Sequence, residues 1–188
     1  DDLMSQALEY REKLLEAVAE FDDHLLEKFL EGAQIEEAEI VAALRQATIA
    51  QKAVPVCCGS AFKHKGVQRL LDCVISYLPS PADVPPVKGH LPNSEEVTTR
   101  QARDDEPFSA LAFKLLTDPV VGRRSFVRVY SGTLRAGSYI YNVSTSRRER
   151  VSRLLEMHAN DRTDRKEAFA GDIVAVVGLK DTTTGDTL

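Results

Sequence analysis

A short loop of small residues is the first place in this sequence where a ligand could be bound. Residues 54–66 read VPVCCGSAFKHKG, with an apolar run before Gly59, Ser60 and Ala61 and a helical pattern after Gly66. Small residues that follow a buried strand let a backbone approach a flat base or a phosphate closely, because no bulky side chain intervenes. The pattern is typical both of a nucleotide-facing loop and of an ordinary strand–helix turn, and so short a motif does not separate them.

The remaining reactive side chains form no evident catalytic set. The four histidines fall on different expected elements, at His24, His64, His90 and His158. The three cysteines, Cys57, Cys58 and Cys73, lack the CxxC spacing of a zinc or redox site, and we interpret them as reduced core residues. A Cys58–His64 dyad would need an orienting acid, and none stands nearby. We therefore predict no catalytic residue and no metal ligand.

Length and composition indicate a two-part globular protein. The chain has 188 residues, 43% of them hydrophobic and 28% charged, with a formal net charge of −5. No apolar run could span a bilayer, and no basic-then-apolar leader is present, so we expect a cytoplasmic protein without membrane contact. A change of pattern near the middle predicts two units.

The first part reads as helical. Apolar residues recur at three- and four-residue steps to about residue 31, with Gly32 as a stop, and a second helix is expected over residues 36–48. A third should follow Gly66 and end before Pro79, with six apolar residues facing inward: Val67, Leu70, Leu71, Val74, Ile75 and Leu78. Four prolines in residues 79–89 predict a stiff connector, and residues 90–106 an exposed loop.

The second part reads as β-rich. The expected strands are residues 108–116, 125–130, 139–143, 149–157 and 172–177. Turn pairs separate them, at Asp118-Pro119, Ser131-Gly132, Ala136-Gly137 and Ala170-Gly171. Several short strands with few helices predict a small closed antiparallel barrel, because closure removes exposed edges. The last residues look like the start of a further strand, and the absence of an initial methionine leads us to expect a fragment. The predicted class is α+β.

Positive charge is concentrated in the expected barrel. Residues 110–155 contain nine Lys and Arg against two acidic residues, a local charge of +7, whereas residues 1–89 carry a charge of −6. Arg147, Arg148 and Arg150 lie beside a predicted hairpin turn. Such a cluster favours either phosphate binding or a strand edge protected from aggregation, and the pattern alone leaves both open.

Longer strings in the chain resemble a known family. They include GSAFKHKGVQRLLDCVISYLPSPADVPP, FKLLTDPVVGRRSFVRVYSGTLRAGSYIYN, RERVSRLLEMHAN and AGDIVAVVGLKDTTTGDTL. Together with LEYREKLLE near the start, they are similar to bacterial elongation factor G over nearly the whole chain. That family comprises five-domain GTPases that drive movement of transfer RNA and messenger RNA on the ribosome. Ribosome-protecting tetracycline-resistance proteins and the peptide-chain release factor GTPase are more distant relatives.

The resemblance implies a domain assignment. Residues 1–81 would be the end of the GTPase domain, including the end of its inserted helical subdomain up to about residue 52. Residues 82–106 would be a linker and exposed loop, and residues 107–188 the β-barrel called domain II, truncated at its C-terminus. Gly59, Ser60 and Ala61 would then face guanine, with the Ser-Ala backbone N–H groups near its carbonyl oxygen.

The resemblance also implies partners and a limit. The barrel would dock on small-subunit ribosomal RNA, with Arg147, Arg148 and Arg150 as candidate contacts, and the helical insert would approach the ribosomal stalk protein. Full-length relatives bind GTP or GDP with Mg²⁺. This sequence has no GxxxxGK[ST], DxxG or NKxD segment, so we expect a monomeric fragment that neither hydrolyses GTP nor binds it measurably. A barrel that binds only protein is the alternative.

Overall fold

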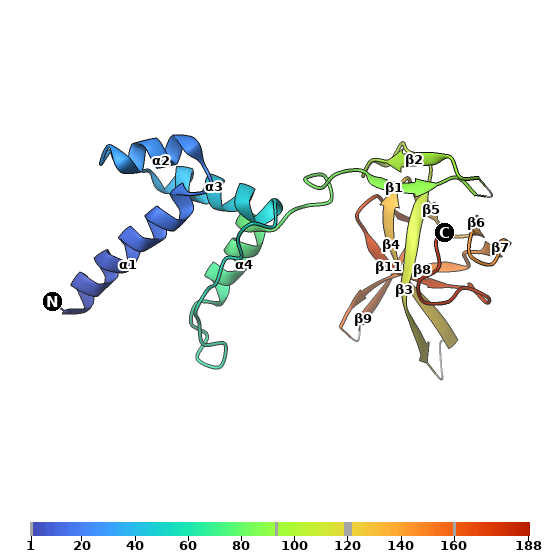
Figure 1. Cartoon of the computed structure of the whole chain (residues 1–188). Helices are drawn as coiled ribbons and strands as arrows, with labels where there is room; N and C mark the ends of the chain where they lie inside the picture. Colours follow the sequence, from blue (N-terminus) through green and yellow to red (C-terminus); the bar gives the residue numbers. More distant parts are fainter. Residues whose placement is uncertain (1, 93, 119–121, 160) are drawn as a thin grey trace. The chain divides into compact units, whose positions relative to one another are not determined.

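The structure is a computed structural model that describes residues 2–92, 94–118, 122–159 and 161–188. The chain divides into two compact units, Asp1–Pro79 and Ser80–Leu188. The regular structure described in the first unit is helical, and the regular structure described in the second unit consists of β-strands, as Figure 1 shows. The predicted α+β class, with a barrel-like second unit, is confirmed. Within the described residues, no helix is long and apolar enough to cross a membrane.

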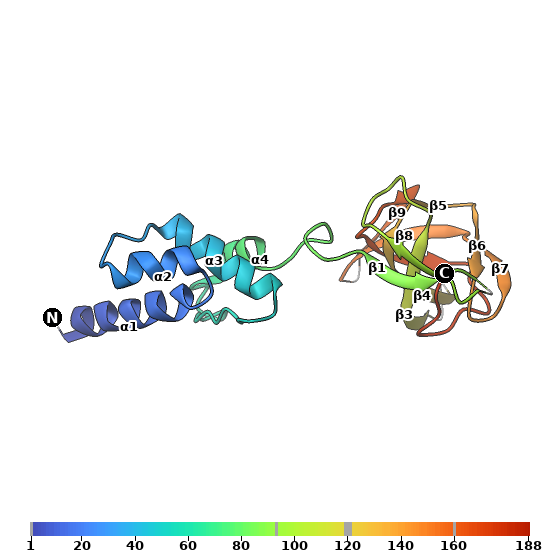
Figure 2. The same ribbon diagram turned by 45° about the horizontal axis from the view of Figure 1, so that its top comes forward.

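The first unit contains four helices: α1 (Asp2–Ala19), α2 (Asp23–Leu30), α3 (Glu37–Ile49) and α4 (Val67–Tyr77). The single long helix expected up to residue 31 is instead α1 and α2, which lie side by side in Figure 2. The break is stabilised by Asp22, whose carboxylate accepts hydrogen bonds from the backbone N–H groups of His24 and Leu25, both at 3.0 Å. Asp at this position satisfies two N–H groups that have no partner within the helix.

A small apolar core joins α1, α2 and α3. Its buried members are Val18, Ala19, Leu25, Ile40 and Ala43. Lys28 Nζ on α2 contacts Glu39 Oε1 on α3 at 2.6 Å, and this hydrogen bond from Lys28 lowers the pKa of Glu39. The guanidinium of Arg45 donates to the carbonyl oxygens of Ile75, Ser76 and Leu78, between 3.0 and 3.3 Å, and so attaches the C-terminal end of α4 to α3.

Two predictions for this unit are wrong. Residues 54–58 form no strand: Val54 and Val56 are 85% and 87% exposed, and Cys57 and Cys58 are exposed as well. The apolar stripe expected to face inward from α4 is also exposed, with Leu71 at 59% and Ile75 at 77%. A buried strand needs neighbouring strands to form hydrogen bonds with its backbone N–H and C=O groups. In the described part of this unit, the regular structure consists of helices and one isolated bridge, Ser60–Lys65, so no such neighbours are present there.

The second unit is built on an antiparallel five-stranded sheet of order β3-β4-β11-β8-β9. Its strands are β3 (Ser109–Asp118), β4 (Gly122–Ser131), β11 (Ile173–Val177), β8 (Arg153–His158) and β9 (Asp161–Arg165). Three further pairs are β1 (Val87–His90) with β2 (Val97–Arg100), β5 (Leu134–Arg135) with β10 (Glu167–Ala168), and β6 (Tyr139–Asn142) with β7 (Arg147–Arg150). The fully buried core includes Val127, Val129, Leu134, Leu154 and Val176.

The strand predictions hold in part. The expected strand over residues 149–157 is two strands, because the chain bends at Val151, whose N–H donates to Ser138 and whose carbonyl accepts from Gly137. The bend lets β7 pair with β6 while β8 joins the main sheet. Residues 90–106, expected as a loop, contain β2 and the end of β1, and the short strands β5, β9 and β10 were not predicted.

The expected turns lie at glycines with positive φ: Gly132 (+72°), Gly137 (+83°) and Gly171 (+98°). The turn expected at Asp118-Pro119 includes Pro119, which lies outside the residues that the structure describes. The end of the chain, where a further strand was expected to start, forms an isolated bridge between Leu111 and Thr187 and no strand. Ala110 and Leu188 exchange two backbone hydrogen bonds there, both at 2.9 Å.

Candidate functional site

The predicted ligand-facing loop is a tight turn closed by its own backbone. Ser60 N–H donates to Lys65 O at 2.9 Å, and Lys65 N–H donates back to Ser60 O at 3.0 Å. A Cβ at Gly59 would lie 2.9 Å from Lys65 O, so this close approach requires glycine. The loop therefore has a defined shape although the segment before it is exposed and unpaired.

The two backbone donors that the resemblance predicts to face guanine are not equivalent. The Ser60 N–H is used in closing the loop, whereas the Ala61 N–H has no acceptor among the residues that the structure describes. The Ala61 carbonyl accepts from His64 N–H at 3.0 Å, and His64 has a positive φ of 53°. If this loop faces a ligand, Ala61 offers the available donor and Ser60 shapes the turn around it.

The cysteines do not form the core that we predicted. Cys57 and Cys58 are exposed because residues 54–58 lie outside any sheet, and Cys73 on α4 is partly exposed. Cys57 Sγ lies 3.6 Å from Cys73 Sγ. No contact between Cys58 and His64 is found among the described side chains, and these also contain no group of three or more His, Cys, Asp or Glu residues that could hold a metal.

Tertiary contacts pair much of the positive charge in the second unit. Carboxylates from outside the basic stretch contact three of its arginines: Glu167 contacts Arg135 at 2.7 Å, Asp164 contacts Arg153 at 2.8 Å, and Asp181 contacts Arg147 at 2.8 Å. Two more arginines are held within the protein, since Arg123 donates to Lys180 O and Thr182 O and Arg124 is 4% exposed. The charge of +7 counted along the sequence therefore overstates the positive charge available to a ligand.

The β6–β7 hairpin presents one exposed face made of two tyrosines and two arginines. Tyr139 pairs with Arg150 and Tyr141 with Arg148 across the two strands. Tyr139 and Tyr141 are 56% and 39% exposed, while Ile140 and Glu149, on the opposite face, are buried. The Arg148 guanidinium carbon lies 4.8 Å from the centroid of the Tyr139 ring. We call Tyr139, Tyr141, Arg148 and Arg150 the hairpin face.

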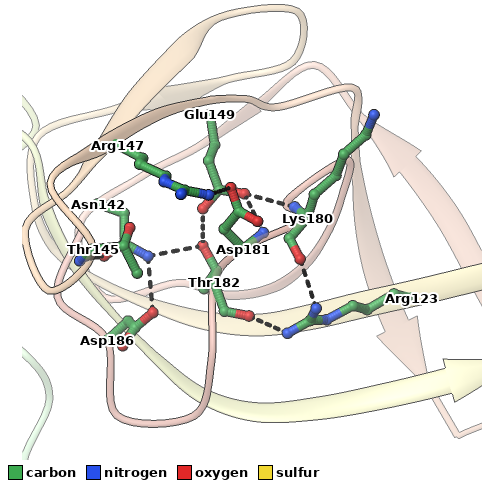
Figure 3. A network of polar contacts seen from close by, with 9 residues as sticks. All are labelled: Arg123, Asn142, Thr145, Arg147, Glu149, Lys180, Asp181, Thr182 and Asp186. Carbon is green, nitrogen blue, oxygen red and sulfur yellow. Dashed lines mark hydrogen bonds and ion pairs between the residues drawn. The ribbon is translucent and has the colours of Figure 1, made fainter.

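A buried polar network behind this face positions the hairpin (Figure 3). One carboxylate oxygen of Glu149 accepts from the backbone N–H groups of Lys180 and Asp181, at 2.6 and 2.9 Å, and the other accepts from Thr182 Oγ1 at 2.5 Å. Asn142 donates to Thr182 Oγ1 at 3.2 Å and to Asp186 at 2.8 Å. The loop over residues 178–187 is thus attached to both strands of the hairpin.

Among the three arginines predicted as RNA contacts, the structure separates one from the other two. Arg147 is bonded to Asp181 at the edge of the polar network, whereas Arg148 and Arg150 project from the hairpin face. The two tyrosines were not predicted, because a count of charges along the sequence does not include them. The alternation Tyr-Ile-Tyr opposite Arg-Glu-Arg, read at the two-residue period of a strand, would have placed all four residues on one face.

A groove of about 550 Å³ adjoins the hairpin on one side. Its lining includes Tyr141 together with Phe108, Tyr130, His90 and Arg100. Aromatic and cationic side chains therefore continue from the hairpin face into a concave surface of the same unit.

Comparison with known proteins identifies the type of the second unit. Residues 122–188 match the family model for elongation factor Tu domain 2. The chain is also similar to a crystal structure of a protein from Thermus thermophilus, with a TM-score of 0.72 and 25% sequence identity. That alignment covers 100% of this chain and 25% of the other, so the chain spans about a quarter of the length of that protein. The second unit thus has the fold of the second domain of a translation elongation factor.

Proposed function

We propose that this chain is part of a translational GTPase of the elongation factor G type, which moves transfer RNA and messenger RNA on the ribosome in the cytoplasm. The observation that carries the proposal is the match of residues 122–188 to elongation factor Tu domain 2, within a chain that aligns over its full length with one larger protein. The long strings shared with elongation factor G favour that factor over ribosome-protection and release-factor relatives.

The domain assignment follows from this proposal. Residues 1–81 correspond to the end of the GTPase domain with part of its helical insert, residues 82–106 to a linker, and residues 107–188 to domain II. The Gly59-Ser60-Ala61 loop would face guanine in the complete protein, with the Ala61 N–H as donor. Its closed backbone and the close approach at Gly59 support this role.

One loop cannot by itself bind or hydrolyse GTP. Phosphoryl transfer depends on groups that position and neutralise the phosphates, and the sequence has no P-loop lysine and no DxxG segment. We expect calorimetry of this chain with GTP or GDP and Mg²⁺ to show no binding at micromolar concentrations. Micromolar affinity would contradict the proposed division of roles.

The second unit would contact ribosomal RNA through the hairpin face. Arginine can contact a phosphate through two parallel N–H donors, and tyrosine rings stack on unpaired bases. The hairpin face presents both kinds of group on four adjacent exposed positions. The helical insert, up to about residue 52, would lie toward the ribosomal stalk protein.

Salt-dependent binding to small ribosomal subunits tests the RNA contact. The double variant Arg148→Glu/Arg150→Glu should bind more weakly, and the slope of log affinity against log salt should fall by roughly 1.4 to 1.8 if each arginine neutralises one phosphate. The double variant Arg135→Glu/Arg153→Glu is the control, because it makes the same change of charge at arginines already paired with carboxylates. Equal binding by both variants would contradict the assignment, and binding that salt does not weaken would favour a barrel that binds protein only.

A further inference from the structure

Two cysteines that are distant in sequence lie next to each other in the first unit. Cys57 Sγ–H donates to Cys73 Sγ over 3.6 Å, although the residues are 16 positions apart. Cys57 belongs to the exposed irregular segment before the Gly59–Gly66 loop, and Cys73 lies in the middle of α4. The neighbouring Cys58 has no contact with another sulfur among the described residues.

We propose that Cys57 and Cys73 are a redox-sensitive pair that forms a reversible disulfide. A disulfide bond is about 2.05 Å long, so the two sulfurs would have to approach by about 1.5 Å. The segment around Cys57 can supply this movement, because Val54 and Val56 on it are almost fully exposed and it belongs to no sheet. The proposal does not depend on the proposed function.

The reaction requires an oxidant, and glutathione disulfide is a suitable one. The exposed Cys57 thiolate attacks one sulfur of glutathione disulfide, forming a mixed disulfide and releasing one glutathione thiolate. The Cys73 thiolate then attacks the Cys57 sulfur, forming the bond between the two residues and releasing the second glutathione thiolate. The protein loses two protons and two electrons, and one glutathione disulfide becomes two glutathione thiols.

The surroundings of the two thiols support this order. Cys57 is exposed and available to the oxidant, whereas Cys73 is partly covered by its neighbours. The pKa of the Cys73 thiol is raised, first by its hydrogen bond with Cys57 and then by burial. The thiolate is the attacking form of a cysteine, so a raised pKa disfavours a first attack by Cys73. Cys73 is suited to the second step because its sulfur already lies next to the sulfur of Cys57.

The bond would constrain the predicted ligand-facing loop. It would link the residue two positions before Gly59 to α4, and the closed ring would contain the whole Gly59–Gly66 loop. Closing a ring of this length restricts the conformations available to the residues inside it. Oxidation would thus reduce the mobility of the loop and of the exposed segment before it, and a reductant would restore both.

Mass spectrometry of the full chain after treatment with glutathione disulfide tests the proposal. The wild type should lose the mass of two hydrogen atoms, and trypsin should release residues 53–63 linked to residues 70–88. Cys57 and Cys58 share the first peptide, so variants must distinguish them. We expect Cys58→Ser to keep the cross-link, and Cys57→Ser and Cys73→Ser to lose it while retaining native circular dichroism.

Several outcomes would overturn the proposal. They are a cross-link that persists in Cys57→Ser through Cys58, a bond between Cys57 and Cys58 within one peptide, or glutathione adducts without a cross-link. Hydrogen exchange provides a second readout. Exchange at residues 59–66 should slow on oxidation in wild type and Cys58→Ser, return on addition of dithiothreitol, and stay unchanged in Cys73→Ser.

Discussion

Glu149 offers the sharpest test of how the hairpin is held in place. Glu149 is only 7% exposed. Its two carboxylate oxygens accept hydrogen bonds from Lys180 N–H, Asp181 N–H and the Thr182 hydroxyl. Replacement by alanine would remove both acceptor oxygens and with them all three hydrogen bonds. It would leave two backbone donors and one hydroxyl of the loop without the partner they have in the native protein.

The expected cost follows from these contacts. A hydrogen bond to a charged group contributes about 1.5–3 kcal/mol, but contributions within one network are not additive. Lys180 and Asp181 are exposed, so water can replace part of what their N–H groups lose. We therefore expect Glu149→Ala to lower the free energy of unfolding of the second unit by about 3–4 kcal/mol. This corresponds to an equilibrium constant for unfolding roughly 150- to 900-fold larger.

Native-state hydrogen exchange measures this change within the full chain. The amides of Val127 on β4 and Val176 on β11 lie in the core, so their exchange reports on global opening of the second unit. Glu149→Gln keeps one oxygen acceptor and should fall between alanine and wild type. Glu167→Ala is the control, because it removes a glutamate whose partner Arg135 is largely exposed, and it should change exchange little.

A small effect of Glu149→Ala would show that Glu149 does not hold the loop over residues 178–187 to the hairpin. If core amides in Glu149→Ala exchanged within about threefold of wild type, the difference would be below about 1 kcal/mol, and the network could not be what holds the loop to the hairpin. Equal effects of Glu149→Ala and Glu167→Ala would lead to the same conclusion.

Two further predictions concern the same unit. Burial raises the pKa of Asp186, but hydrogen bonds from Asn142 and Thr183 lower it by more, so the pKa in the folded protein lies below the ordinary value of 3.8. The ionised carboxylate therefore stabilises the fold at pH values above 3.8. This contribution is lost as the pH falls through the lower pKa of the folded protein. Denaturant unfolding at several pH values below about 5 should therefore show a flatter acid decline for Asp186→Asn than for wild type. At Gly132, with φ +72°, a Cβ would lie 2.7 Å from backbone atoms of Glu106 and Phe108, whereas at Gly137, with φ +83°, nothing lies within 4 Å. Gly137→Ala should lower the free energy of unfolding by about 1–2 kcal/mol, because alanine disfavours this backbone conformation, and Gly132→Ala should lower it by clearly more. Thermal unfolding measures both changes. Equal decreases of the melting temperature in the two variants would contradict this expectation.

Elements with a strong local pattern were predictable from the sequence. The helix after Gly66 ends before Pro79 as expected, because proline cannot continue it, and the strand containing residues 125–130 is found within β4. The break between α1 and α2 was not predicted, because the apolar spacing continues across it. The break depends on Asp22, whose side chain caps the N-terminus of α2. The bend at Val151 likewise depends on hydrogen bonds to residues 137 and 138, which the local pattern does not reveal.

For the candidate sites, the sequence by itself determined the types of residue and their local spacing: small residues before α4, arginines at alternate positions of a hairpin, and turns at glycines. Tertiary structure alone decided which of these groups are available. Asp164, Glu167 and Asp181 neutralise arginines far from them in sequence, and Cys57 meets Cys73 across the Gly59–Gly66 loop. The reason is that charge pairing and sulfur contact act over a few ångströms in space, and separation along the chain does not specify distances of that kind.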